Sequence, residues 1–339
     1  MNSSLGVVAI GRNEGERLRR CMRSVVSNVE HLVYVDSGST DGSVAFARTV
    51  GAEVVELDMS RPFTMARGRN AGLARLLARD SPPDLVQFVD GDCELVEGWL
   101  ETGMAELRAR PELAAVSGRR RERDRTRNVF HRLTDMEWDT PVGETLAFHG
   151  DVMVRVAALR QTGSFDETMI AGEEPELSAR LREAGWKLWR LDADMTLHDV
   201  DMHRFGQWWK RSLRSGYAYA EGAARHGRGP MKHWARQVRS HWFWGLLFPL
   251  FILFTVWPSG GWSLALLAAY PAMAVKIAIY RRRMHGNPWS DAFLYGGFVM
   301  LGKLPNTLGQ ATYWWNRWRG KRAGLIEYKS ASPSRCGSQ

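Results

Sequence analysis

The sequence has only three cysteines, and their spacing fits neither a disulfide framework nor a metal-binding motif. Cys21, Cys93 and Cys336 lie far apart among the 339 residues, which predicts a protein of a reducing compartment. Residues 1–4 carry no charged segment that leads into an apolar run. We therefore expect no signal peptide.

Acidic residues are fewer than basic ones, with 37 Asp and Glu against 46 Lys and Arg and a formal net charge of +9. This balance suits anionic partners such as acidic lipid headgroups, phosphorylated small molecules or nucleic acid. The chain contains no recognised nucleic-acid-binding module, so we expect no nucleic-acid partner. The 15 tryptophans concentrate in the second half, a distribution typical of a membrane interface.

Five short apolar runs alternate with polar helical stretches in the first part of the chain. The runs are residues 7–10, 31–35, 52–55, 85–89 and 113–116. This order predicts β-α-β units and the α/β class, with a mostly parallel sheet flanked by helices. Ligands of such sheets bind beyond the carboxyl ends of the strands, so the polar residues that follow each run are the candidate binding residues.

Two long apolar runs in the second half predict a transmembrane helical hairpin over residues 241–283. Residues 242–257 are uncharged, and Lys276 is the only charged residue among residues 262–280. Each run is near the ~17–25 residues that span a bilayer. Arginines flank both ends of the hairpin, so the positive-inside rule places both ends, and the preceding domain, on the cytoplasmic side of the inner membrane.

The segments around this hairpin are amphipathic. Residues 204–240 predict helices that lie in the membrane interface, although 205–219 could instead pack against the soluble domain. Residues 284–329 predict an interfacial or re-entrant helical segment, and residues 330–339 a disordered tail. The basic run 119–127 is open to two interpretations, a solvated loop or a contact with phosphate or lipid headgroups.

Acidic residues follow two of the predicted strands. Asp90-Gly91-Asp92 comes directly after the run 85–89, and a divalent cation would relieve the repulsion between its carboxylates. Mg²⁺ or Mn²⁺ would complete its coordination with phosphate oxygens and water. The turn 36–42 begins with Asp36, which could bind a ribose or a base or could belong to an ordinary βα turn.

These features occur with others in one order, and together they resemble glycosyltransferase family 2, inverting enzymes with the GT-A nucleotide-sugar fold. The resemblance covers residues 6–203 and implies a GT-A catalytic domain over residues 1–203. The motifs that carry it are residues 8–14, 36–42, 66–72, 90–92, 163–167 and 172–177.

The resemblance implies a donor site for a nucleotide-diphosphate sugar and a metal cofactor, Mn²⁺ or Mg²⁺. Asp36 would contact the base, Asp90 the ribose, and Arg67, favoured over Arg69, the nucleotide or diphosphate. Asp92 would bind the metal with His198, although His198 could instead be a capped loop histidine. The full set of implied donor-binding residues is Ile10, Asn13, Glu14, Asp36, Arg67, Asp90 and Gly91.

The resemblance places the acceptor side at Glu173 and Glu174, where the family usually has Glu-Asp. Inverting transfer needs a general base for the acceptor hydroxyl, and Glu174 is the residue that matches it. Alternatively, these carboxylates only stabilise a helix N-terminus. Trp138 and Asp151 lie where the acceptor surface of the family forms.

The expected function is inverting sugar transfer to a hydroxyl of a lipid-linked acceptor, such as a polyprenyl-diphosphate sugar, in surface polysaccharide or glycolipid synthesis at a membrane. A sugar-phosphate nucleotidyltransferase is a competing reading, but residues 11–15 lack the Gly-rich loop with arginine of those enzymes. A non-catalytic membrane scaffold is the third reading, and the retained Asp90, Asp92 and Glu174 argue against it.

Overall fold

The computed structural model describes residues 4–229 and 232–321, and the chain divides into two compact units. Of the described residues, unit 1 comprises 4–125 and 138–201, and unit 2 comprises 126–137, 202–229 and 232–321. The division after Asp201 lies close to the expected boundary at residue 203. No sequence pattern indicated that residues 126–137 belong with the second unit. The expected tail 330–339 lies outside the described residues.

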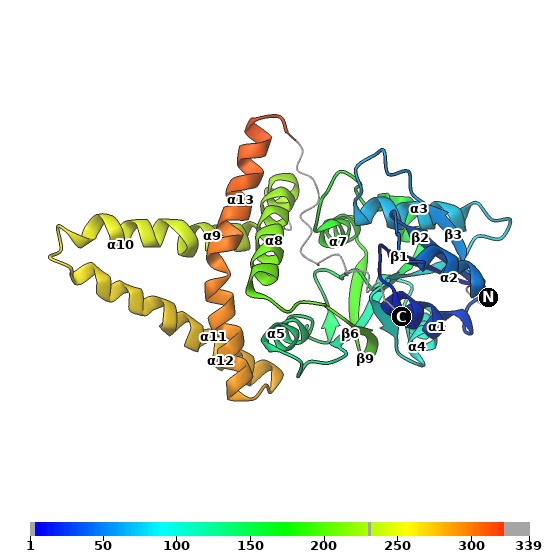
Figure 1. Cartoon of the computed structure of the whole chain (residues 1–339), viewed down its shortest axis with the longest axis horizontal. Helices are drawn as coiled ribbons and strands as arrows, with labels where there is room; N and C mark the ends of the chain where they lie inside the picture. Colours follow the sequence, from blue (N-terminus) through cyan, green and yellow to red (C-terminus); the bar gives the residue numbers. More distant parts are fainter. Residues whose placement is uncertain (1–3, 230–231, 322–339) are drawn as a thin grey trace, which may run out of the picture. The chain divides into compact units, whose positions relative to one another are not determined.

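Unit 1 is built around a sheet of nine strands in the order β3-β2-β1-β4-β8-β6-β9-β5, with β7 paired to β9 (Figure 1). Strands β5, β7 and β8 run against the direction of the other six, so the sheet is mixed. The strands are β1 (Leu5–Gly11), β2 (His31–Asp36), β3 (Glu53–Glu56), β4 (Leu85–Asp90), β5 (Cys93–Leu95), β6 (Leu113–Glu122), β7 (Gly143–Glu144), β8 (Val152–Arg155) and β9 (Lys187–His198).

Helices cover both faces of this sheet, because its strands have apolar side chains on both faces. In β1, Val7 and Ala9 belong to one core cluster while Val8 and Ile10 belong to the other, as the two-residue period of a strand requires. Helices α1 (Glu16–Val26), α2 (Ser43–Thr49) and α4 (Trp99–Ala109) contribute to the first cluster, and α3 (Met65–Leu77), α6 (Val156–Thr162) and α7 (Glu173–Glu183) to the second. The expected α/β fold with a helix-flanked sheet is confirmed.

The basic run that begins at Arg119 is the main departure from the expected elements. Residues up to Glu122 continue strand β6, which pairs in parallel with β9. Arg119, Arg120 and Glu122 are buried, so the interpretation of this part of the run as a solvated loop is wrong. Charged side chains can occupy such a strand because they pair with one another inside the unit.

Unit 2 is helical. Its elements are α5 (Val129–Glu137), α8 (Phe205–His226), α9 (Ala235–Trp242), a π-helical turn (Phe243–Leu247), α10 (Phe248–Val256), a 3₁₀ segment (Trp262–Ala268), α11 (Ala269–His285), α12 (Trp289–Leu301) and α13 (Lys303–Trp318). Helix α8 packs against α13 at glycines: a Cβ on Gly216 would lie 2.1 Å from the Asn306 carbonyl oxygen, and one on Gly309 2.0 Å from that of Leu213. Such close backbone approach is typical of helices that pack through small residues.

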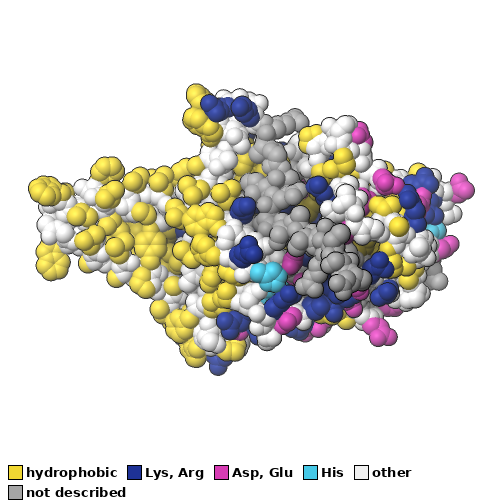
Figure 2. All heavy atoms as spheres, in the orientation of Figure 1, with side chains coloured by type: hydrophobic (Ala, Val, Ile, Leu, Met, Phe, Trp, Pro, Cys, Tyr) yellow, Lys and Arg dark blue, Asp and Glu magenta, His cyan; other side chains and the backbone are white. Residues whose placement is uncertain are grey.

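Two continuous helices of unit 2 are long and apolar enough to cross a membrane by length and composition, Ala235–Val256 and Trp262–His285. Only 11% of each apolar window is buried, and Figure 2 shows the apolar side chains gathered over this hairpin. Trp257 and Trp262, on either side of its turn, are 93% and 83% exposed. An exposed apolar surface of this extent marks an interaction site.

Candidate functional site

The Asp90-Gly91-Asp92 motif lies at the carboxyl end of β4, next to the carboxyl end of β1. The Gly91 N–H donates to the Ile10 carbonyl oxygen at 2.8 Å, and a Cβ on Gly91 would lie only 3.0 Å from the same oxygen. The glycine therefore lets the chain turn tightly against β1. As a result, Asp90 and Asp92 both lie at the edge of the sheet where ligands of α/β folds bind.

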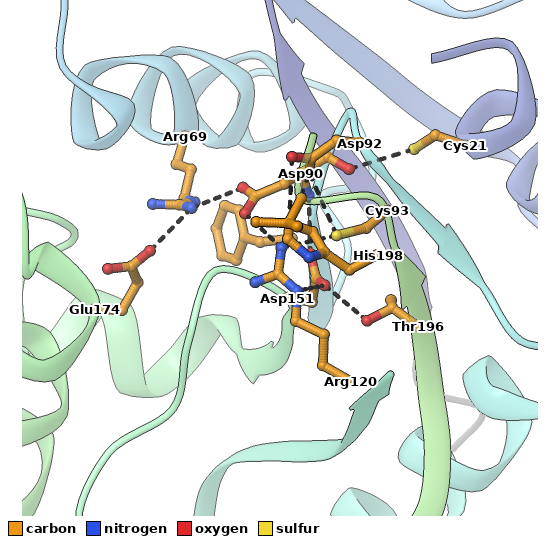
Figure 3. Close-up of polar contacts among 12 residues, drawn as sticks. Cys21, Arg69, Asp90, Asp92, Cys93, Arg120, Asp151, Glu174, Thr196 and His198 are labelled. Atoms are coloured by element: carbon orange, nitrogen blue, oxygen red, sulfur yellow. Dashed lines mark hydrogen bonds and ion pairs between the residues drawn. The ribbon is translucent and has the colours of Figure 1, made fainter. Parts of the chain in front are cut away.

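Two buried arginines hold the carboxylate of Asp90 (Figure 3). Its Oδ1 lies 2.9 Å from Nη2 of Arg69, and its Oδ2 lies 3.3 Å from Nη2 of Arg120. Burial raises the pKa of Asp90, but the two guanidinium groups outweigh it, so the pKa is lower than the ordinary value. Gly150 makes room for this arrangement, since a Cβ there would lie 2.4 Å from Oδ2 of Asp90.

Asp151 supports this cluster from below and does not face an acceptor surface. Its side chain is 0% exposed, and its oxygens accept from the Asp90 N–H at 2.9 Å and the Thr196 hydroxyl at 2.8 Å. Nε of Arg120 lies 3.3 Å from its Oδ2. The expected acceptor-side position of Asp151 is therefore corrected, because a buried, fully engaged carboxylate cannot contact a sugar.

Asp92, Cys93 and His198 form a buried group whose ligand atoms all lie within 4.8 Å of one another. Nε2 of His198 lies 3.4 Å from Oδ2 of Asp92, and Nδ1 contacts Oε1 of Glu122. Burial and Arg120 lower the pKa of His198, but the carboxylates of Glu122 and Asp92 outweigh them. The net effect raises the pKa to about 9. An oxygen and an imidazole nitrogen this close fit neighbouring ligands of one divalent cation.

Trp138 covers the same group of side chains. The guanidinium carbon of Arg120 lies 4.7 Å from the centroid of its ring, and the rings of His149 and His198 pack edge-on to it at 4.8 Å and 6.2 Å between centroids. Trp138 is half-buried. The structure thus brings Trp138, which we expected on the acceptor side, beside His198, and cation–π contact fixes Arg120 under its ring.

Glu173 and Glu174 begin helix α7 and meet the same arginine that holds Asp90. Nη1 of Arg69 lies 2.9 Å from Oε1 of Glu173, and Nη2 lies 3.0 Å from Oε1 of Glu174. Glu173 is buried, whereas 14% of the Glu174 side chain is exposed. Burial and the Glu173 carboxylate raise the pKa of Glu174 to about 7, against the opposing effect of Arg69.

The loops after β1 and β2 are tied together by Asn13 and Asp36. The Asn13 N–H donates to the Ser39 hydroxyl at 2.9 Å, and its Oδ1 accepts from the Thr40 N–H at 2.7 Å. Oδ2 of Asp36 accepts from the N–H groups of Gly38 and Ser39 at 2.9 Å and 2.8 Å. Asp36 is 2% exposed, so in this structure it shapes the turn that it begins.

Arg67 and Arg69, two residues apart on α3, point to different partners. The guanidinium of Arg67 donates to the carbonyl oxygens of Asp58 and Arg61 at 2.7 Å and 3.1 Å, and so braces the loop before the helix. Arg69 instead reaches the carboxylates of the cluster. The structure thus brings Arg69 to the carboxylate cluster, and the expected contact of Arg67 with the nucleotide or diphosphate stays a prediction.

The remaining expected residues lie at the same edge of the sheet. Glu14 is paired with Arg17 at 2.8 Å, and the Ile10 side chain packs in the core below. Arg120, Glu122 and Gly150 were not found from the sequence. Two of them are charged residues of a basic run and the third is an isolated glycine, so hydropathy gives no signal for any of them.

A helix-flanked mixed sheet thus carries two carboxylates, those of Asp90 and Asp92, at the edge where ligands of α/β folds bind. The chain superposes on the structure of a mannosyltransferase from Pyrobaculum calidifontis in complex with GDP-Man and Mn²⁺. The match covers 94% of this chain and 88% of the mannosyltransferase, with a TM-score of 0.60 and 16% sequence identity. At this identity the likeness shows the fold, which is GT-A. Residues 7–161 match the model of Glycosyl transferase family 2, so this part of the chain is similar to that family.

Two curated proteins are similar to this chain over part of its length. A pre-mycofactocin glycosyltransferase of Mycobacterium tuberculosis is 29% identical over 235 residues, which are 65% of this chain and 47% of that protein. The glycosyltransferase AglE of Haloferax volcanii is 23% identical over 221 residues, 60% of this chain and 69% of that protein. The chain thus spans about half the length of the first relative.

Proposed function

We propose that this chain is an inverting glycosyltransferase that moves a sugar from a nucleotide-diphosphate donor to a hydroxyl of a lipid-linked acceptor. The observation that carries the proposal is the shared arginine. Arg69 joins Asp90, at the donor edge of the sheet, to Glu174, at the start of α7. A donor-side carboxylate and a partly exposed glutamate thus lie together, as transfer between two bound substrates needs.

In this proposal Asp92 and His198 hold a divalent metal, Mn²⁺ or Mg²⁺. Their oxygen and nitrogen lie 3.4 Å apart in a buried group, which supports a shared cation. When bound, the metal would stabilise the negative charge that develops on the departing diphosphate. The carboxylate of Asp90, held by Arg69 and Arg120, would orient the ribose, and the loops around Asn13 and Asp36 would bound the nucleotide.

Glu174 would act as the general base. Its carboxylate would take the proton from the acceptor hydroxyl as the oxygen attacks the anomeric carbon on the side opposite the diphosphate, which inverts the configuration. A base works best when its pKa lies near the working pH, and the pKa of Glu174 is raised to about 7. Glu173, more deeply buried, would keep Arg69 in place.

A lipid-linked acceptor at the inner membrane fits the apolar hairpin. Arg236 and Arg239 lie at the start of the first hairpin helix, and arginines 281–283 lie near the end of the second, so both ends would face the cytoplasm. The sugar donor is made in that compartment in this scheme, and a polyprenyl-linked acceptor would present its headgroup at the same surface. The product would serve surface polysaccharide or glycolipid synthesis.

The test is a donor screen with the full chain in detergent. UDP- and GDP-sugars are supplied with Mn²⁺ or Mg²⁺, with and without a membrane lipid extract, and both nucleoside diphosphate release and transfer of radiolabel to lipid are measured. We expect release that depends on metal and lipid, with label in the lipid phase. Turnover that labels only water-soluble acceptors would remove the lipid from the proposal. Pyrophosphate release would indicate a nucleotidyltransferase, and the absence of any donor binding a scaffold.

A further inference from the structure

Glu122 and His198 face each other across two parallel strands. They are partners in the register of β6 and β9, and both are buried, with side-chain exposures of 0% and 5%. Oε1 of Glu122 contacts Nδ1 of His198, and Oε2 accepts from the Val200 N–H at 3.2 Å. One carboxylate therefore fixes both the imidazole and the backbone just beyond it.

The contact between Glu122 and Nδ1 of His198 decides which imidazole nitrogen is available to bind a metal. An ionised carboxylate only accepts hydrogen bonds, so Nδ1 of His198 carries a hydrogen toward Glu122. The other nitrogen, Nε2, points to Oδ2 of Asp92 at 3.4 Å. Ligands at about 2.1 Å from one octahedral cation stand about 3 Å apart, so the imidazole is already close to the position that a shared metal requires.

We propose that Glu122 is a positioning residue, which holds His198 in the tautomer and orientation that bind the divalent metal together with Asp92. The inference rests on the proposed function, because it assumes that His198 is a metal ligand. Glu122 would act on the metal only through His198. Histidine ligands of metals in other proteins are commonly oriented by a carboxylate in this way. Its position within a run of arginines hides this role in the sequence.

Glu122→Gln separates this role from simple support of the strands. The amide offers one acceptor where the carboxylate offers two, so it can serve either His198 or Val200 but not both. If the amide oxygen stays on Val200, its NH₂ group faces Nδ1 and reverses the tautomer. If the oxygen stays on His198, only the backbone N–H loses its partner. The metal site changes in the first case alone, so metal coordination is the decisive readout.

Mn²⁺ is titrated into the full chain by calorimetry, in the presence of UDP and separately of GDP, and pulsed EPR measures the coupling of bound Mn²⁺ to imidazole ¹⁴N. We expect wild type to show this coupling, and Glu122→Gln to bind Mn²⁺ about 10–100-fold more weakly with the coupling reduced. Glu94→Gln is the matched control. Glu94 lies on β5, which pairs with β9; its carboxylate pairs with Arg123 and its side chain is 30% exposed. Its replacement should leave both measurements unchanged.

Wild-type affinity and coupling in both Glu122→Gln and Glu122→Asp would overturn this inference and leave the proposed function intact. Mn²⁺ binding by wild type without ¹⁴N coupling would also overturn it, because His198 would then be no ligand, while sugar transfer could still be measured. Failure of wild type to bind Mn²⁺ with either nucleotide would overturn the metal in both proposals. If Glu122→Gln does not fold, Glu122→Asp decides. It keeps both acceptors but withdraws them by one methylene, and an unchanged Mn²⁺ affinity would contradict the proposal.

Discussion

Nη2 of Arg69 lies 3.0 Å from Oε1 of Glu174, so the proposed base is paired with a cation that is itself buried. The same nitrogen lies 2.9 Å from Oδ1 of Asp90. A carboxylate that is paired in this way is a weaker base than a free one, yet burial and the adjacent Glu173 work in the opposite direction. The arginine therefore holds Glu174 in place without removing its ability to accept a proton.

Replacing Glu174 with glutamine should abolish transfer while the donor still binds. The amide has nearly the same shape but cannot take a proton from the acceptor, and loss of a general base typically lowers the rate by about 10²–10⁴-fold. The measurements are kcat from nucleoside diphosphate release and donor affinity from calorimetry. Glu183→Gln, at the exposed end of the same helix, is the control and should retain full activity. Full turnover of Glu174→Gln would remove this residue from the mechanism.

The pH dependence of kcat should reflect the raised pKa of Glu174. The base acts in its ionised form, and its pKa of about 7 leaves it largely protonated in mildly acidic buffer. We expect kcat at saturating donor and acceptor to rise about tenfold per pH unit below pH 7 and to level off above it. Donor affinity, measured by calorimetry over the same range, should show no matching break. A kcat already constant from pH 5 upward would contradict the assignment.

The sequence was sufficient to predict the position of those candidate residues that stand at the ends of strands or at the start of a helix. Asp90, Asp92 and Glu174 stand at strand or helix ends, where strand order alone brings them to one edge. Apolar runs also located the strands of the parallel half, because buried strands of such sheets are nearly continuous in apolar residues. For these positions, local pattern and tertiary position agree.

The residues that the sequence missed are those placed by strand pairing. Arg120 and Glu122 extend β6 through a charged segment. Their partners lie far along the chain, Asp151 directly before β8 and His198 at the end of β9. Hydropathy predicts exposure for such residues, and only the paired sheet shows that their charges compensate one another in the interior. The sequence also cannot separate Arg67 from Arg69, since both lie on one helix and only tertiary contacts distinguish them.

Gly150→Ala should disturb the donor site. The new Cβ would lie 2.4 Å from Oδ2 of Asp90 and 2.8 Å from Nη2 of Arg69, so Asp90 must give up at least one of its arginine contacts. We expect the donor KM to rise at least several-fold, and overpacking to lower the free energy of unfolding by about 1–3 kcal/mol. Gly206→Ala, where nothing lies within 4 Å of the added Cβ, is the matched control. An unchanged donor KM in Gly150→Ala would show that Asp90 can move freely.

Charges on the exposed face of α10 should release the chain from membranes. Leu253 and Phe254 are 66% and 75% exposed within the first of the two apolar helices. An aspartate in a spanning helix costs up to about 2.5–3.5 kcal/mol, the value at its centre. We expect wild type to sediment with membranes and to resist a carbonate wash. The Leu253→Asp, Phe254→Asp double variant should appear in the soluble fraction after the carbonate wash.

Leu146→Asp is the control for this experiment, since Leu146 is 70% exposed but lies in unit 1. It adds a charge to an exposed leucine outside the hairpin and should sediment with membranes as wild type does. Folding of all three proteins is compared by nucleotide binding in detergent, so that loss from the membrane is not confused with unfolding. Membrane association that survives the double aspartate would mean that other surfaces of the chain hold it there, and the hairpin would then lose its role in presenting a lipid-linked acceptor.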